Sequence, residues 1–357
     1  MSKKIRIGIS VGDINGIGME VIIKTFQDSR MLDMCTPIIY GSSKVSTFHR
    51  KALHINDFSF NIIKSAKEAN IKKPNIINCW PEDVEITLGQ STEAGGKYAL
   101  ASLEAATEDL KNGEIDALVT APINKENIQS ETFNFPGHTE YLTEKFEGNS
   151  LMLMVNDNIK IGVATNHIPL SKVANTLTSD TIFEKLKILN KALLQDFCIT
   201  SPRIAVLGLN PHAGDNGLIG KEEENVIIPA IDNAKSIGIN TFGPYPADGF
   251  FGSGNYQKFD AILAMYHDQG LIPFKSLSFG EGTNFTAGLN IIRTSPDHGV
   301  AYEITGQNKA EESSFRQAVY TACDIYKNRV FSAEINENPL KPAKGKWFEL
   351  EIQHIYN

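Results

Sequence analysis

Cysteine is scarce in this sequence, and the few cysteines present are widely separated. Cys35, Cys79, Cys198 and Cys323 form no CxxC pair. A disulfide framework and a cysteine zinc knuckle both need recurring, closely spaced cysteines, so the sequence argues against each of them. Scattered thiols that stay reduced are typical of a cytoplasmic protein, and we therefore expect a cytoplasmic location.

Long apolar runs and a leader pattern are also missing. No stretch approaches the roughly 20 apolar residues that a membrane-spanning helix needs. Residues 1–6 lead directly into a strand pattern, without the apolar region and cleavage site of a signal peptide. The sequence therefore predicts no association with a membrane.

Positive charge is in the minority. The chain has 34 Lys and Arg against 42 Asp and Glu, a net charge of -8, which argues against a nucleic-acid partner. Apolar residues make up 41% and charged residues 21%, as in ordinary soluble proteins. A length of 357 residues exceeds one typical core, so two domains or one large α/β domain are expected.

Several catalytic motifs are absent as well. The chain has no GxSxG elbow, no P-loop and no HExxH, so hydrolase, kinase and zincin interpretations have no support. A glycine-rich turn at residues 12–18 invites comparison with a dinucleotide-binding loop. However, Val21 stands where a third glycine or alanine belongs, and the second strand ends at Tyr40 without an acid for a ribose. We therefore expect Asp13 and Asn15 to shape the turn instead.

Apolar strand patterns alternate with helical patterns along most of the chain, which is typical of an α/β protein. Strands are predicted at residues 4–11, 36–40, 115–120, 203–209 and 261–265, with a hairpin at 151–155 and 159–165. Helices are predicted at residues 19–26, 91–106, 181–197, 222–238 and 311–330, the fourth with a kink at Pro229. Residues from 336 onward are expected to form an irregular tail.

Three histidines each follow the end of a predicted apolar strand. His267 follows the strand at 261–265, and His167 and His212 follow two others. If these strands are parallel, their carboxyl ends share one edge of the sheet, where α/β proteins bind ligands. Three neutral imidazoles there fit a divalent metal with an open coordination position, although chance placement is the alternative. Such a metal favours substrates that supply oxygen ligands, such as a hydroxy acid.

Basic and donor groups are expected near the same edge. His138 and Thr139 lie at a predicted helix N-terminus, where backbone N–H groups favour an anion. Lys275 and Arg293 add cations, and arginine suits phosphate or carboxylate. Together these residues suggest an anionic substrate. In the alternative interpretation, Thr139 only caps the helix, and the two cations form ordinary surface ion pairs.

With these pieces assembled, the chain resembles the 4-hydroxythreonine-4-phosphate dehydrogenase family of pyridoxal phosphate biosynthesis. The resemblance runs from residue 4 to about residue 330 and excludes the tail. The matching motifs are Gly12-Asp-x-Asn-Gly-Ile-Gly18, Thr120-Ala-Pro-x-x-Lys125, Gly137-His-Thr-Glu140, Thr165-x-His167-x-Pro-Leu170, Gly208-Leu-Asn-Pro-His-Ala-Gly214, Pro246-Ala-Asp248, Tyr266-His-Asp-Gln-Gly270 with Lys275, and Gly282-x-Asn284 through Arg293-Thr-Ser-x-Asp-His-Gly299.

The resemblance implies an α/β fold like that of isocitrate and isopropylmalate dehydrogenases, and not a Rossmann fold. Two α/β domains would enclose a cleft. Residues 1–130 plus 268–357 would form the first domain, and residues 131–267 the second, which carries the dimer contacts. The protein would be a homodimer with its active site at the subunit interface.

The resemblance also implies the chemistry. NAD or NADP would oxidise 4-phosphooxy-L-threonine at its 3-hydroxyl, and decarboxylation would give 3-amino-2-oxopropyl phosphate. One divalent metal per subunit (zinc, magnesium or cobalt) is implied. The implied metal ligands are His167, His212 and His267; the substrate-binding positions are His138, Thr139, Lys275, Asn284 and Arg293; the cofactor positions are Asp297, His298 and Gly299. Asp248 is a candidate general base, with a structural loop carboxylate as the alternative.

Three departures from the family pattern concern the expected cofactor side. Ala287 stands where Leu is usual, Asn290 where Pro is usual, and Val300 where Thr is usual, which leaves the choice between NAD and NADP open. Two other functions remain possible from the sequence. One is a dehydrogenase of the same fold acting on a phosphothreonate or phosphoerythronate. The other is a metal-dependent anion-binding protein without turnover.

Overall fold

The computed structural model describes residues 4–81 and 83–337. Its twelve strands form one mixed sheet in the order β3-β4-β2-β1-β5-β12-β11-β6-β7-β10-β8-β9. The strands are β1 (Arg6–Ser10), β2 (Thr36–Gly41), β3 (Asn61–Ile63), β4 (Asn75–Asn78), β5 (Ala117–Thr120), β6 (Leu151–Val155), β7 (Lys160–Val163), β8 (Ile204–Leu207), β9 (Thr241–Tyr245), β10 (Ala261–Ala264), β11 (Thr283–Ala287) and β12 (Arg293–Pro296). The α/β fold class predicted from the sequence is confirmed.

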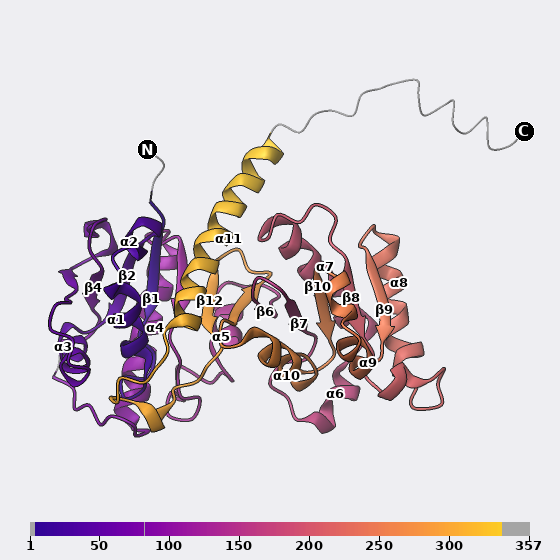
Figure 1. Ribbon diagram of the computed structural model, residues 1–357, viewed down its shortest axis with the longest axis horizontal. Helices are drawn as coiled ribbons and strands as arrows, with labels where there is room; N and C mark the ends of the chain where they lie inside the picture. The colour runs from indigo at the N-terminus through magenta and orange to yellow at the C-terminus, as the bar shows by residue number, and fades with distance from the viewer. Residues whose placement is uncertain (1–3, 82, 338–357) are drawn as a thin grey trace, which may run out of the picture.

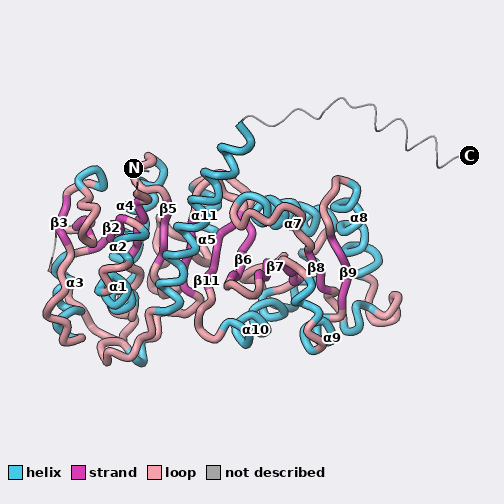
Figure 2. The backbone as a smooth tube through the Cα atoms, turned by 45° about the horizontal axis from the view of Figure 1, so that its top comes forward, coloured by secondary structure: helices cyan, strands magenta, loops and turns pink. Residues whose placement is uncertain are grey.

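Helices cover both faces of this sheet (Figure 1). They are α1 (Gly18–Gln27), α2 (Met31–Met34), α3 (Ser43–Ala52), α4 (Glu93–Lys111), α5 (His138–Lys145), α6 (Leu170–Thr176), α7 (Ser179–Gln195), α8 (Ile228–Ser236), α9 (Ala247–Gly252), α10 (His267–Ser278) and α11 (Ser313–Glu337). Figure 2 shows α7 and α10 on opposite sides of β6 and β7. In the described ranges, no helix has the length and apolar character needed to cross a membrane.

Most predicted elements are present, and two local predictions are confirmed in detail. Strands β6 and β7 form the expected antiparallel hairpin. The helix at 222–238 is irregular near the expected position, because a π-helical turn (Glu223–Ile227) gives way to α8 just before Pro229 while the chain stays helical. Helix α10 was not predicted. Helix α11 continues past its predicted end at residue 330, and the rest of the predicted irregular tail lies outside the described residues.

The sheet reverses direction in its middle. Strands β1, β5 and β12 are parallel to one another, and so are β7, β10 and β8. Between these halves, β11 is antiparallel to β12 and β6, and β6 is antiparallel to β7. Because three antiparallel steps separate β12 from β7, the halves run in opposite directions. The amino end of β12 therefore lies at the same edge as the carboxyl ends of β7, β10 and β8.

The core lies on both sides of the sheet. Ile7 and Ile9 of β1 share one apolar cluster with Phe315 of α11, whereas Leu118 of β5 shares another with Leu103 of α4. All five side chains are fully buried. Burial of each stabilises the fold by roughly 1.5–3 kcal/mol. This double covering fixes β5 and β12, whose ends carry cleft residues.

The division into two domains stays a prediction, because the sheet continues across it. Strand β11 of the first predicted domain pairs with β6 of the second over five residue positions. Helix α10, which begins at the predicted boundary, lies against β7 and β10 of the second domain. Any boundary at residue 268 therefore falls at the start of a helix.

His49 of α3 is buried and has a consequence for acid stability. Its side chain is 1% exposed, and its Nε2 lies 2.7 Å from the carbonyl oxygen of Ile14 in the glycine-rich turn. Burial lowers the pKa of His49 from 6.5 to about 4, and the hydrogen bond to Ile14 opposes this shift only in part. Between these values, the unfolded chain binds a proton that the folded chain does not.

We expect the free energy of unfolding to fall as the pH drops from 6.5 to about 4, by up to about 3 kcal/mol from His49. Above pH 6.5 the residue is neutral in both states, so its contribution is constant there. Urea unfolding at about pH 7 and about pH 5 should show a smaller acid loss for His49→Gln than for the natural chain. An equal loss in both proteins would contradict this assignment.

Candidate active site

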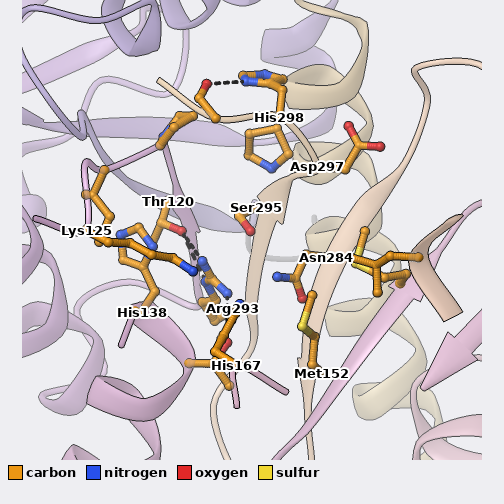
Figure 3. Close-up of a pocket in the computed structure, with 18 of the residues that line it drawn as sticks. Thr120, Lys125, His138, Met152, His167, Asn284, Arg293, Ser295, Asp297 and His298 are labelled. Carbon is orange, nitrogen blue, oxygen red and sulfur yellow. Dashed lines mark hydrogen bonds between the residues drawn. The ribbon is translucent and has the colours of Figure 1, made fainter. Parts of the chain in front are cut away.

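A cleft lies over the middle of the sheet, where its direction reverses. Its walls come from the segment after β5, the start of α5, strands β6, β11 and β12, helix α10, and the loop after β12. Figure 3 shows side chains from these elements converging on one space. The cavity volume is about 280 Å³, which suits a small metabolite better than a whole dinucleotide.

Arg293, the first residue of β12, is the buried cation of the cleft and is 2% exposed. Its Nε and Nη2 donate to Thr120 Oγ1 at 3.1 and 2.6 Å, and its Nη1 donates to Thr286 Oγ1 at 3.2 Å. No carboxylate of the described residues forms an ion pair with it. Burial lowers the pKa of Arg293 to about 10, opposed by the charge of Glu140, so it remains charged at neutral pH. Neutral hydroxyls do not balance the charge of a buried guanidinium, so the site suits an anionic ligand that would pair with it.

Helix α5 begins beside Arg293. The N-cap is Gly137, so His138 and Thr139 occupy the first helical positions, and the alternative of Thr139 as N-cap is wrong. His138 is 9% exposed, and its Nε2 is buried without a hydrogen-bond partner. Burial, and then the charges of Arg293 and Lys125, hold the pKa of His138 well below its usual value. A neutral imidazole and free N–H groups therefore face the cleft at the positive end of a helix dipole.

His167 and His267 lie together at the cleft, with ring centroids 5.5 Å apart. Nδ1 of His167 is 3.3 Å from Glu140 Oε1, and Nδ1 of His267 is 2.7 Å from Asp268 Oδ1. Carboxylates that hold one ring nitrogen leave Nε2 free, which is how metal-binding histidines are oriented. The pair fits two ligands of a divalent metal.

His212 lies in the loop after β8 and is exposed. Its φ is 55°, and three further non-glycine residues of this loop are also left-handed. Buried Glu223 holds the loop, since its Oε1 accepts from the N–H groups of Leu209 and Asn210 at 2.7 and 2.8 Å. Across residues 4–81 and 83–337, no three His, Cys, Asp or Glu side chains are placed to bind one metal ion. One copy of the chain therefore brings together two of the three predicted ligands.

The other predicted site residues divide between the cleft and the surface. Those that line the cleft are Lys275, Asn284, Asp297, His298 and Gly299. Nζ of Lys275 donates to the carbonyl oxygen of Asp297 at 3.2 Å, and Oδ1 of Asn284 is buried without a partner. Asp248 does not line the cleft; it is exposed on α9, which packs beside the His212 loop.

Three cleft residues received no role from the sequence. Thr120 binds Arg293, Glu140 contacts His167, and Lys125 lines the cleft from the segment after β5. All three belong to motifs recognised in the sequence. The available signal was their position: Thr120 ends the buried strand β5, Lys125 lies in the segment after it, and Glu140 lies in the first turn of α5.

A sequence profile of the family described as "PdxA: Pyridoxal phosphate biosynthetic protein PdxA" matches residues 33–322. The chain belongs to this family. The 4-hydroxythreonine-4-phosphate dehydrogenase of Bacteroides thetaiotaomicron is 53% identical over 340 residues, 95% of this chain and 93% of the relative. The family resemblance predicted from the sequence is confirmed.

Two further PdxA-family comparisons bear on fold and substrate. The crystal structure of 4-hydroxythreonine-4-phosphate dehydrogenase from Klebsiella pneumoniae has a TM-score of 0.78 and 33% identity, covering 91% of this chain and 98% of its own. An Oceanobacillus iheyensis protein, provisionally named D-threonate 4-phosphate dehydrogenase, is 37% identical over 332 residues, 91% of this chain and 99% of its own. This chain is a dehydrogenase of the PdxA family.

Proposed function

We propose that this PdxA-family enzyme oxidises 4-phosphooxy-L-threonine at its 3-hydroxyl with NAD or NADP. Loss of carbon dioxide then gives 3-amino-2-oxopropyl phosphate, in pyridoxal 5'-phosphate biosynthesis. The observation that carries the proposal is Arg293, a buried guanidinium beside a cleft of about 280 Å³, with no carboxylate partner in the part of the chain that the structure describes. A small substrate with two anionic groups supplies what this cleft lacks, and the names of the relatives support its identity.

The substrate's phosphate would lie at the start of α5. There the first N–H groups of the helix, the His138 imidazole and the Arg293 guanidinium can all donate to phosphate oxygens. Lys275, on α10, would take the carboxylate, and Asn284 would orient the polar groups between them. This placement would set C3 beside His167 and His267.

The nicotinamide cofactor would bind along the Asp297, His298 and Gly299 segment at the rim of the cleft. Bound there, it would accept the hydride from C3. Ser314 Oγ lies 3.0 Å from Asp297 Oδ1 and donates to the carbonyl oxygen of Gly282 at 2.8 Å, which ties this segment to α11 and the start of β11. The chain's own part is to fix the cofactor segment, which follows the carboxyl end of β12, relative to Arg293 at the amino end of the same strand.

A divalent metal (zinc, magnesium or cobalt) fits the His167 and His267 pair, since their Nε2 atoms are free and carboxylates hold their Nδ1 atoms. Bound there, it would supply Lewis-acid chemistry at the substrate's C3 oxygen. Within residues 4–81 and 83–337, one chain does not supply a third His, Cys, Asp or Glu ligand to this pair.

We therefore propose a homodimer whose active site lies at the subunit interface. His212 of the partner subunit would complete the metal site, which is supported by its exposure and by the rigid loop that Glu223 holds. Asp248 of the partner subunit would arrive with it as general base, since α9 packs beside that loop. Light scattering at micromolar protein concentration should give a dimer mass, and a monomer mass would rule this arrangement out.

A second function within the same fold is oxidation of a phosphothreonate or phosphoerythronate, which the Oceanobacillus iheyensis relative brings forward. Both substrates offer the phosphate and carboxylate that the cleft needs. Assaying the purified enzyme with each and following NADH absorbance separates the two. If no phosphorylated hydroxy acid gives NADH while metal binds, an anion-binding protein without turnover is favoured.

The phosphate should matter strongly to turnover. If Arg293 and the start of α5 hold it, 4-hydroxy-L-threonine without phosphate should react with a kcat/KM lower by roughly 10- to 150-fold or more, the loss of one charge-assisted contact or several. The measurement is steady-state NADH formation with both compounds. Equal kcat/KM values would refute phosphate anchoring in this cleft.

A further inference from the structure

The glycine-rich turn at residues 12–18 is packed against the cleft and is not an open dinucleotide loop. Gly12 has a φ of +67°, and a Cβ there would lie 2.1 Å from the carbonyl oxygen of Pro122. The N–H of Asp13 donates to the same oxygen at 3.0 Å. At Gly16, a Cβ would lie 2.2 Å from Val300 Cγ1. The turn therefore braces two cleft-lining segments, one after β5 and one after β12.

The Asp13 carboxylate is the junction of this brace. It is 1% exposed and accepts hydrogen bonds from the Asn127 side chain at 2.8 Å and the Tyr302 hydroxyl at 2.7 Å. Asn124 Nδ2 donates to the same Tyr302 hydroxyl at 3.2 Å. The segment from Pro122 to Asn127 is thus held at both ends, in a position that does not depend on its exposed residues.

The braced segment presents Lys125 to the cleft. Lys125 lines the cleft, and its Cε would lie 3.8 Å from a Cβ added at Gly137, so its chain passes over the start of α5. Figure 3 shows Lys125, His138 and Arg293 around one space. No acidic side chain of the described residues forms an ion pair with Lys125. Two cations and an unpartnered, buried imidazole nitrogen thus meet around one space.

We propose that Lys125 is a substrate-binding residue that contacts the phosphate at the start of α5, and that Asp13 is a positioning residue for it. The proposal rests on the proposed function, whose substrate carries the phosphate. A phosphate monoester has a charge of roughly -1.5 to -2 near neutral pH, so one guanidinium leaves it incompletely neutralised. Lys125 supplies the second cation, and Lys275 on the other wall remains for the carboxylate.

The first test compares Lys125→Met with Lys111→Met, a control at an exposed lysine in the last turn of α4. Lys125→Met should lower kcat/KM for 4-phosphooxy-L-threonine by roughly 10- to 100-fold, and change it less than roughly threefold for 4-hydroxy-L-threonine. The control variant Lys111→Met should leave kcat/KM unchanged for both substrates. Equal losses with both substrates would overturn the phosphate contact.

Binding without turnover separates this proposal from the proposed function. Calorimetry with 4-phosphooxy-L-threonine, in the absence of NAD, should show weaker binding to Lys125→Met by a similar factor. If the natural chain forms no NADH, the proposed function fails, while this binding ratio still decides the role of Lys125. Unchanged binding would overturn the proposal.

The second test concerns Asp13. Oδ2 of Asp13 accepts from both Asn127 and Tyr302, and Oδ1 accepts from the Asn15 N–H. Asp13→Asn turns one of these two acceptors into a donor, and should weaken phosphate-dependent kcat/KM by roughly 3- to 30-fold through misplacement of Lys125. In the Lys125→Met background the same change should cost no further activity, because the side chain it positions is gone. Independent, multiplying losses would show that Asp13 only stabilises the fold.

Discussion

Replacing Arg293 with methionine should lower kcat/KM for the phosphorylated substrate by at least roughly 100-fold without lowering the thermal unfolding temperature. Arg293 is buried among three hydroxyls, and no carboxylate among the described residues pairs with it. Burial lowers its pKa from 12.5 to about 10, so the charged form disfavours folding at neutral pH by about 3 kcal/mol. Methionine removes that cost together with the anion site.

Arg329 offers the matched control, because it pairs with a carboxylate. Its Nε lies 2.6 Å from Asp196 Oδ1, and the Asp196 side chain is 4% exposed. Removing one partner of a buried pair typically costs 3–5 kcal/mol, and roughly half of that is expected here because Arg329 is partly exposed. Arg329→Met should therefore lower the unfolding temperature and retain activity in the folded fraction. Arg293→Met should therefore lose activity without a lower unfolding temperature, whereas Arg329→Met should have a lower unfolding temperature without losing activity. Full activity in Arg293→Met would refute its role.

Mixing two inactive variants should restore activity if the metal site is shared between subunits. His212→Ala and His267→Ala should each abolish metal binding and turnover when alone. In a mixed dimer, one site combines an intact His167 and His267 pair with an intact His212 of the partner subunit. Random mixing makes half of the dimers mixed, each with one good site, so activity should reach roughly a quarter of the natural level.

The control for this experiment uses two residues that the structure places in one chain. Mixing His167→Ala with His267→Ala leaves every site short of one ligand, since these rings face each other in the same subunit. That mixture should stay inactive. Metal analysis on each purified sample distinguishes a lost ligand from a lost fold. Recovery in the control, or none in the His212 mixture, would contradict the shared site.

The sequence predicted elements well where the signal was local. The hairpin of β6 and β7 follows from apolar runs on either side of residues 156–158, and the irregularity in the helix at 222–238 lies just before Pro229. Helix α10 was not predicted from the sequence, because Gly270 and Pro273 are typical of loops. It forms because Leu271 and Phe274 bury one face of it against the sheet, which tertiary packing alone decides.

Many of the cleft residues were predicted, but their arrangement was not. Arg293 was recognised in a motif, but its hydrogen-bond partner was not. That partner is the Thr120 hydroxyl, 173 positions away in the sequence, and not a carboxylate. The reversal of the sheet was equally hidden, since strand patterns do not reveal direction. It explains why Arg293, at the start of its strand, lies near His167, which follows the end of another. All three histidines follow predicted strands in the same way, so the sequence did not reveal that His212 lies apart from His167 and His267.

The continuous sheet also limits how this enzyme can move. Strands β11 and β6 join its halves through paired residues directly under the cleft. A free hinge between the halves would have to break that ladder, so we expect any opening and closing to proceed by twisting of the strands themselves. The shape of the cleft would then follow the twist of the strands that carry Arg293 and Asn284. Stiffness of these central strands, rather than loop length, would set the amplitude of closure.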